Sequence, residues 1–105
     1  MVSFKDEDHA IELANDSKFG LGGAVWTSNV AKAHRCAQKV KAGVFWVNSH
    51  HRNDPSAPWG GFKESGIGRE NGIASYNEYT TTQTVVIRTT DAKEDWFSDP
   101  NARYS

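Results

Sequence analysis

Apolar residues recur at helical spacing near the start of the chain and then give way to glycine. In residues 6–16, DEDHAIELAND, the apolar positions fit one face of a helix, and the acidic residues lie in the first turn, where the helix dipole favours them. Three glycines between positions 20 and 23 break this pattern. Residues 21–27, LGGAVWT, are typical of a short strand. We therefore expect a helix followed by a strand.

A second amphipathic helix is predicted directly after this strand. Ser28 or Asn29 can cap its first turn, and Gly43 can end it after two lysines in the last turn. Its apolar stripe consists of Val30, Ala33, Ala37 and Val40. Residues 44–48, VFWVN, follow as an apolar run of the kind found in strands buried on both faces. A strand, a helix and a strand with short links predict a βαβ unit with parallel strands, and hence an α/β fold.

The second half of the chain is expected to hold a loop, a short helix and a further strand. Residues 49–61 contain two prolines and a glycine pair among polar residues, and long loops of this kind are often functional. A short helix is predicted over 69–76. Residues 80–88, TTTQTVVIR, alternate as a strand with apolar character on both faces. In the polar tail, Trp96 and Phe97 are predicted to anchor the chain to a surface.

The composition of the chain argues against several classes of function. The 105 residues carry a net charge of -1, from 12 basic and 13 acidic residues, without the basic stripe expected of a nucleic-acid-binding protein. No apolar run approaches the roughly 20 residues of a membrane span, and the first residues do not resemble a signal peptide. A single cysteine, Cys36, fits a reducing cytosol. We therefore expect a cytoplasmic chain that binds neither nucleic acid nor membrane.

The glycine-rich block at residues 58–72, PWGGFKESGIGRENG, raises the question of a phosphate site. A Walker loop requires Ser or Thr after its lysine, but Lys63 is followed by Glu64. The last three glycines of the block are spaced one residue too far apart for a dinucleotide fingerprint, and Glu70 would put negative charge near any phosphate. The glycines are therefore predicted to permit positive φ and close backbone packing.

Histidine and cysteine offer little evidence for a metal site or a nucleophile. His50 and His51 would point in opposite directions in an extended chain, and no second pair lies at ligand spacing. No metal site is therefore expected, and the two histidines are predicted to be solvated loop residues. Cys36 lies within a predicted helix, on a different face from His34, and is expected to pack rather than to react.

Two further residues in the glycine-rich block have both a functional and a structural interpretation. Glu70, if buried, would have a raised pKa suited to proton transfer, whereas at a helix start it would be an ordinary surface glutamate. Trp59 lies on a loop stiffened by prolines. It could form a pocket wall whose ring attracts a quaternary ammonium group, or it could simply plug the fold.

Taken together, four stretches of the chain resemble the C-terminal end of the aldehyde dehydrogenase superfamily, and the betaine-aldehyde and aminoaldehyde members in particular. They are AIELANDSKFGLGGAVWT, AGVFWVN, PWGGFKESGIGRENG and YNEYTTTQTVVI, in family order and at family spacing over about nine-tenths of the chain. The resemblance implies NAD(P)-dependent oxidation of an aldehyde, such as betaine aldehyde, to its acid. In that reaction a cysteine attacks the carbonyl, hydride passes to the nicotinamide, and a glutamate-activated water hydrolyses the thioester.

The resemblance also implies which catalytic parts this chain does not supply. The family's nucleophilic cysteine, general-base glutamate and Rossmann cofactor domain all precede the stretch that is matched here, and Cys36 does not match the nucleophile. The chain is therefore expected to comprise the C-terminal portion of the catalytic domain over residues 1–77, and the oligomerisation arm and tail over residues 78–105. No NAD(P) is expected to bind this chain alone.

Residue by residue, the resemblance assigns four positions. Asn48 matches the asparagine that ends the last catalytic strand near the substrate tunnel, and residues 49–59 match the segment that shapes the tunnel mouth. Trp59 matches an aromatic residue of the box around the ammonium group in betaine-aldehyde members. Glu70 and Lys63 match residues beneath the active site, proposed to act in proton relay or near a potassium site.

Three functional hypotheses follow from this resemblance. The chain is a fragment or truncated member of the family that is inactive alone, an assembly module, or a shortened product without a role of its own. In the assembly module, the strand around Thr82–Arg88 pairs with a second copy or with full-length aldehyde dehydrogenase subunits. A second copy is also expected to cover the apolar faces of the GGAVWT and VFWVN strands.

Overall fold

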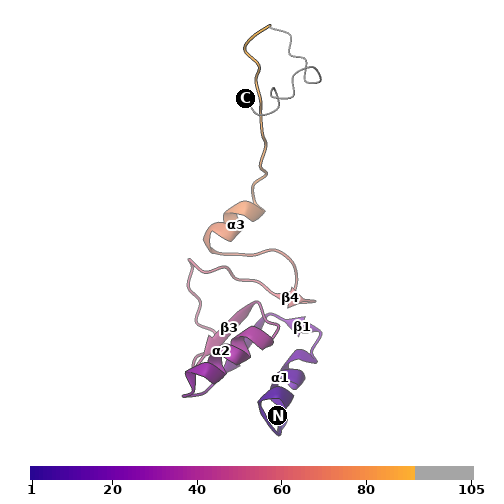
Figure 1. The fold of residues 1–105 in the computed structure, drawn as a ribbon, viewed down its shortest axis with the longest axis vertical. Helices are drawn as coiled ribbons and strands as arrows, with labels where there is room; N and C mark the ends of the chain where they lie inside the picture. Colours follow the sequence, from indigo (N-terminus) through magenta and orange to yellow (C-terminus); the bar gives the residue numbers. More distant parts are fainter. Residues whose placement is uncertain (92–105) are drawn as a thin grey trace, which may run out of the picture.

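The computed structural model describes residues 1–91, which form three helices and two small sheets of two strands each (Figure 1). The predicted anchor at Trp96 and Phe97 lies outside the described residues, as does most of the predicted tail. The division into portions 1–77 and 78–105 stays a prediction. None of the helices in residues 1–91 is long and apolar enough to cross a membrane.

The first helix, α1, spans Glu7–Asn15, within the predicted range. Asp6 caps it, because its side chain accepts a hydrogen bond of 2.9 Å from the backbone N–H of His9. Glu7 and Asp8 lie in the first turn, where negative charge stabilises the positive end of the helix dipole.

The predicted βαβ unit is confirmed. Strand β2 (Gly22–Val25) and strand β3 (Val44–Val47) pair in parallel, in a register that runs from Gly22 opposite Val44 to Val25 opposite Val47. Helix α2 (Val30–Lys39) connects them, capped by an Asn29 side chain that accepts a 3.0 Å hydrogen bond from the N–H of Lys32.

Two details of this unit differ from the prediction. Helix α2 ends at Lys39, and Val40 is already extended, so Gly43 does not terminate the helix. Gly43 is instead required for close backbone packing, because a Cβ at this position would lie 1.7 Å from the carbonyl oxygen of Gly60. The prediction that β3 is buried on both faces is also wrong, since Val47 is 42% exposed; a sheet of two strands has too few neighbours to cover it.

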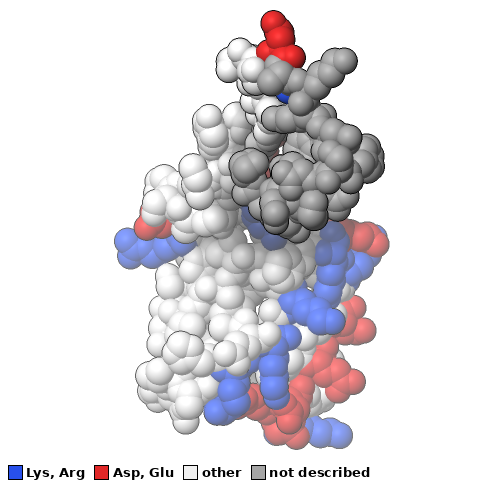
Figure 2. All heavy atoms as spheres, turned by 45° about the horizontal axis from the view of Figure 1, so that its top comes forward, with Lys and Arg blue, Asp and Glu red and all other residues white. Residues whose placement is uncertain are grey.

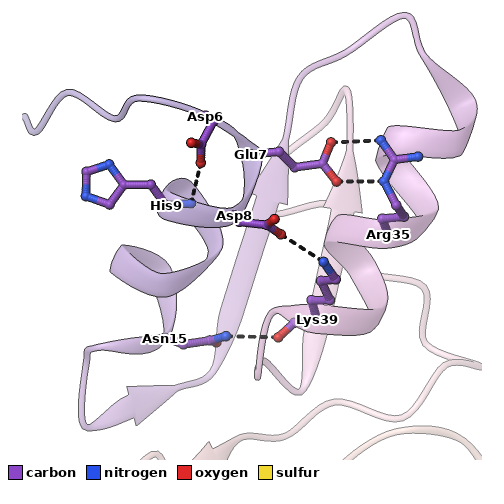
Figure 3. Close-up of polar contacts among 7 residues, drawn as sticks. All are labelled: Asp6, Glu7, Asp8, His9, Asn15, Arg35 and Lys39. Carbon is purple, nitrogen blue, oxygen red and sulfur yellow. Dashed lines mark hydrogen bonds and ion pairs between the residues drawn. The ribbon is translucent and has the colours of Figure 1, made fainter.

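Three polar contacts join α1 to α2 (Figure 3). Arg35 donates two hydrogen bonds, of 2.7 and 2.8 Å, to the carboxylate of Glu7. Lys39 contacts Asp8 at 2.9 Å, and its backbone carbonyl accepts a 2.9 Å bond from the Asn15 amide. The hydrogen bond from Arg35 lowers the pKa of Glu7, and the bond to Asp8 raises the pKa of Lys39.

The buried core is small and lies beside this unit. Among the described residues, four apolar side chains are buried: Ile11, Ala33, Cys36 and Trp46. Cys36 is one of them, so the expectation of a packing cysteine is confirmed. On the face shown in Figure 2, acidic and basic side chains gather along one flank, and much of the other flank is uncharged.

A second sheet, which the sequence did not predict, joins the start of the chain to the glycine-rich block. Strand β1 (Phe19–Gly20) pairs antiparallel with β4 (Phe62–Lys63). Helix α3 spans Gly72–Glu78, so the predicted start at residue 69 is wrong; residues before Gly72 are held in other pairings.

The predicted strand at 80–88 is not formed. Residues 80–91 are extended and exposed, and they run away from the rest of the described chain (Figure 1). A strand requires a partner for its backbone hydrogen bonds, and no segment of residues 1–91 lies beside this one. Val85, Val86 and Ile87 are consequently 68%, 89% and 76% exposed.

Candidate functional site

Trp59 and Glu70 lie opposite each other in a single antiparallel bridge. The N–H of each donates to the carbonyl oxygen of the other, and both distances are 2.7 Å. Side chains that are directly opposite in such a pair project to the same face. The structure therefore brings the two candidate site residues together, and the bridge fixes the loop that ends at Trp59 against the glycine-rich block.

Both residues line an open hollow of about 380 Å³, which we call the Trp59 hollow. Its other charged residues are Arg69 and Glu78, and Tyr79 adds a second aromatic ring. Glu70 is exposed, so the burial that would suit it to proton transfer is not observed in this chain. It also precedes α3 by two residues, and so it does not start that helix.

Within residues 1–91, Arg69 forms no ion pair with either of these carboxylates. Its Nη1 donates to the carbonyl oxygens of Gly61, at 3.1 Å, and Gly68, at 2.7 Å. The guanidinium also lies over the ring of Phe62, 5.6 Å from its centroid. Within residues 1–91, neither Glu70 nor Glu78 forms a side-chain hydrogen bond or ion pair. The Trp59 hollow is therefore negatively charged at its rim.

Behind Trp59 lies a cluster of aromatic rings. The buried ring of Trp46 is 5.9 Å from that of Trp59, 5.3 Å from that of His50 and 6.3 Å from that of His51. The His51 ring is 6.0 Å from Trp59 and nearly perpendicular to it. The prediction that the two histidines point in opposite directions is wrong, because His51 has a φ of 59° and the chain there is not extended.

Asn48 directly follows the last residue of β3, Val47, and its side chain forms hydrogen bonds to the backbone of Thr27. Its amide oxygen accepts a 2.8 Å bond from the N–H of Thr27, and its amide nitrogen donates a 2.9 Å bond to the carbonyl of the same residue. The side chain thus continues the β2–β3 ladder beyond Val47. A φ of 53°, which asparagine tolerates better than most residues, turns the chain into the loop.

Lys63 is also held by backbone groups. Its ammonium donates to the carbonyl oxygens of Asn15 and Ser17, each at 2.7 Å. These carbonyls lie at the C-terminal end of α1, where a cation is favoured by the helix dipole and by unpaired carbonyls. In this chain Lys63 therefore joins the glycine-rich block to α1.

Hydrogen bonds within the loop contribute to its order. Asp54 accepts bonds from the N–H of Ser56, at 2.9 Å, and from its hydroxyl, at 2.7 Å. These bonds lower the pKa of Asp54. The N–H of Gly72 donates to the carbonyl of Pro55 at 3.0 Å, which ties the middle of the loop to the start of α3.

The described residues do not fit a nicotinamide dinucleotide. The glycines with positive φ in the block, Gly66, Gly68 and Gly72, lie before or at the start of a helix of only seven residues. Glu70 and Glu78 lie in the same hollow as Gly68. Such a rim repels a pyrophosphate group. Nor do residues 1–91 contain three histidine, cysteine or acidic side chains grouped to hold a metal ion.

Sequence reasoning missed Trp46 and Arg69 as parts of the site. Trp46 stands in a run that predicts a strand core, and nothing in that run indicates that its indole reaches the following loop. Arg69 follows Gly66 and Gly68, which indicate a tight turn, but the carbonyls that it binds are set by the folded chain.

The parallel βαβ unit and the glycine-rich block that carries Trp59 together form a small α/β unit. Residues 1–85 match the aldehyde dehydrogenase family, and the chain belongs to that family. It is 43% identical over 96 residues to betaine aldehyde dehydrogenase of Bacillus subtilis (strain 168), covering 91% of this chain and 20% of that protein. It is 45% identical over 84 residues to phenylacetaldehyde dehydrogenase of Pseudomonas fluorescens, covering 80% of this chain and 17% of that protein.

Solved structures agree with this assignment. The crystal structure of betaine aldehyde dehydrogenase from Staphylococcus aureus in complex with NAD+ is similar, with a TM-score of 0.82 and 45% identity over 91% of this chain and 19% of that one. Indole-3-acetaldehyde dehydrogenase of P. syringae in complex with NAD+ has a TM-score of 0.74 and 44% identity, over 76% and 16% of the two chains. The chain thus spans about one-fifth of the length of the relatives that it matches.

Proposed function

We propose that this chain is the C-terminal part of an NAD(P)-dependent aldehyde dehydrogenase and supplies one wall of its substrate site. The substrate we propose is an aldehyde that carries an organic cation, such as betaine aldehyde. The observation that carries this proposal is the pairing of Trp59 with Glu70 at the Trp59 hollow. The similarity to betaine aldehyde dehydrogenases supports it.

The physical basis is the joint attraction of a ring face and unpaired carboxylates for a cation. An aromatic face attracts a quaternary ammonium group by about 0.5–1 kcal/mol at exposed sites, and by more where water is excluded. Glu70 and Glu78 together carry two negative charges against the one positive charge of Arg69, so the lining of the hollow keeps an excess of negative charge. A neutral aldehyde such as phenylacetaldehyde would gain nothing from these carboxylates.

In this proposal the chain binds and orients the substrate but does not turn it over. Cys36 is buried beside α1 and β2, away from the Trp59 hollow, and we assign it no role as a nucleophile. The nucleophile, the general base and the NAD(P) site would be supplied by the remainder of the family's catalytic machinery. The purified chain, incubated with NAD and betaine aldehyde, should therefore form no NADH, and turnover at the rates of full-length relatives would refute this part of the proposal.

Cation binding can be measured on the chain alone. The four tryptophans each provide an indole N–H signal in a ¹H–¹⁵N spectrum. Tetramethylammonium chloride should shift the Trp59 signal, whereas sodium chloride at the same concentration should not. Trp26, which is 65% exposed and outside the hollow, serves as the internal control. Equal shifts of Trp26 and Trp59, or no shift of Trp59, would contradict the proposal.

A second candidate function is assembly through the segment Thr82–Arg88. Val85, Val86 and Ile87 are exposed on an extended backbone without a partner strand in residues 1–91, and such edges favour pairing with another chain. The partner would be a second copy or a full-length subunit. Sedimentation should show concentration-dependent association that Val86→Lys weakens and Thr81→Lys does not. A monomer at all concentrations would contradict self-association.

A further inference from the structure

Trp46 is the one aromatic residue of the ring cluster that lies on a regular strand. It is the third residue of β3 and pairs with Ala24 of β2, so its backbone is held by the parallel ladder. Its side chain is only 9% exposed. The other rings of the cluster, those of His50, His51 and Trp59, belong to the loop that follows β3.

The indole of Trp46 contacts this loop in two ways. Its Nε1–H donates a 2.8 Å hydrogen bond to the carbonyl oxygen of Arg52. Its ring lies within 6.3 Å of both histidine rings and of Trp59. One buried side chain thus contacts the loop near its start and at its end, and each contact restricts the same stretch of backbone.

Gly22 provides the space for this indole. A Cβ at Gly22 would lie 2.8 Å from Cζ3 of Trp46, closer than a real Cβ approaches a ring carbon. The indole therefore lies against the bare backbone of β2, which limits its movement toward the sheet. Phe45, the preceding residue of β3, projects to the other face, where a Cβ at Gly23 would be 3.0 Å from its ring.

We infer that Trp46 is a positioning residue of the substrate wall: it sets the orientation of Trp59 and His51 and so determines which aldehydes the loop admits. The inference rests on the proposed function, in which the loop before Trp59 is that wall. It goes further, because it assigns specificity to a side chain of the strand core that does not line the Trp59 hollow.

The test compares Trp46→Leu with Phe45→Leu in the 105-residue chain. Both changes remove a ring from β3 and should lower its stability. Only Trp46→Leu should abolish the nuclear Overhauser contact between the His51 and Trp59 rings. It should also raise the hydrogen-exchange rates of the Trp59 and Gly72 amides by about tenfold relative to Phe45→Leu. Equal behaviour of the two variants, or a ring contact that persists in Trp46→Leu, would overturn the inference.

Two milder variants decide the matter if Trp46→Leu does not fold. Gly22→Ala leaves every loop residue intact but displaces the indole, and it should weaken the same ring contact. Trp46→Phe keeps an aromatic ring without the N–H, so it should retain part of the contact. If the contact between the His51 and Trp59 rings keeps its full strength in Gly22→Ala, this result would count against the inference.

Tetramethylammonium provides the readout that links positioning to specificity. Its effect on the Trp59 signal should be several-fold weaker in Gly22→Ala than in the unmodified chain, and unchanged in Phe45→Leu. If the unmodified chain shows no response, the proposed cation wall fails. The ring contact and amide exchange then still decide whether Trp46 positions the loop.

Discussion

Trp59 and Glu70 exchange two backbone hydrogen bonds of 2.7 Å across a gap of eleven positions in the chain. The bridge places an indole and a carboxylate on one face, at the rim of a hollow of about 380 Å³. Neither residue belongs to a regular strand, so their relative position depends on the segments that hold them. Those segments are the loop after β3, anchored by Trp46, and the glycine-rich block, anchored by Lys63 and Arg69.

Gly43→Ala should prevent the chain from folding. The added Cβ would lie 1.7 Å from the carbonyl oxygen of Gly60, and neither atom can rotate away, because the backbone fixes the Cβ and the oxygen belongs to the backbone. We expect a loss of about 3 kcal/mol or more in the free energy of unfolding. Gly23→Ala, whose Cβ would meet the Phe45 ring at 3.0 Å, is the matched control and should be milder. Urea unfolding followed by circular dichroism measures both, and a stable Gly43→Ala chain would contradict the packing described here.

The part of the fold that sequence could predict is the part whose signals are local. An N-cap and an apolar run mark the start of α2 and the place of β3, and both elements form there. The predicted stripe is only partly right, because Val30 and Ala37 are exposed and the buried residues of α2 are Ala33 and Cys36. By contrast, β1 and β4 have two residues each, too few to show a period, and their pairing is decided by chain folding. The alternation at 80–88 is a genuine strand pattern, but a strand also requires a partner. The cluster of aromatic rings could not be predicted for another reason. A positive φ at His51, which the sequence does not indicate, turns the His51 ring toward Trp59.

Lys63→Met should loosen the connection between the glycine-rich block and α1. The ammonium donates to two carbonyl oxygens at 2.7 Å, and its loss leaves both without that donor. Because Lys63 is exposed, water can partly replace it, and we expect a loss of about 1 kcal/mol in the free energy of unfolding. Lys18→Met is the control: its ion pair with Glu64 is 3.1 Å long between exposed side chains, and its removal should change stability by less than about 0.5 kcal/mol. Equal effects in denaturant unfolding would show that Lys63 has no special role.

The contact between Glu7 and Arg35 should make stability depend on pH on the acid side. The pKa of Glu7 is lowered from its ordinary 4.5, mainly by the hydrogen bond from Arg35, so the folded chain binds the proton less readily than the unfolded chain. Its contribution is therefore fully present above pH 4.5 and is lost as the pH falls through the lower, folded-state pKa. Glu7→Gln should lower the thermal midpoint at pH 7 by a few degrees, and this difference should disappear in acid.

Glu12→Gln provides the control for that experiment. Glu12 is on the same helix, is exposed and forms no ion pair within the described residues. Its substitution should leave the midpoint nearly unchanged at every pH. A high salt concentration should also reduce the effect of Glu7→Gln, because exposed ion pairs are screened. A difference between the Glu7 variant and the unmodified chain that persists in acid would contradict the assignment.

Variants of Asn48 can show whether this residue binds substrate directly or only holds the backbone of the site in place. Its side chain bonds both backbone groups of Thr27, and its φ of 53° is unfavourable for most residues. Asn48→Ala should lose both bonds and strain the backbone, at a combined loss of about 2–3 kcal/mol. Asn48→Gly relieves the backbone strain and isolates the lost hydrogen bonds, so it should be less damaging. Asn48→Asp keeps the acceptor for the Thr27 N–H but places a carboxylate oxygen against the Thr27 carbonyl, and it should be at least as damaging as Asn48→Ala. If Asn48 acts only through Thr27, every variant that folds should retain the response of the Trp59 signal to tetramethylammonium. Urea unfolding should then give the highest midpoint for Asn48→Gly, a lower one for Asn48→Ala, and one no higher than that for Asn48→Asp. A glycine variant that folds normally but loses the cation response would instead assign Asn48 a direct role at the substrate.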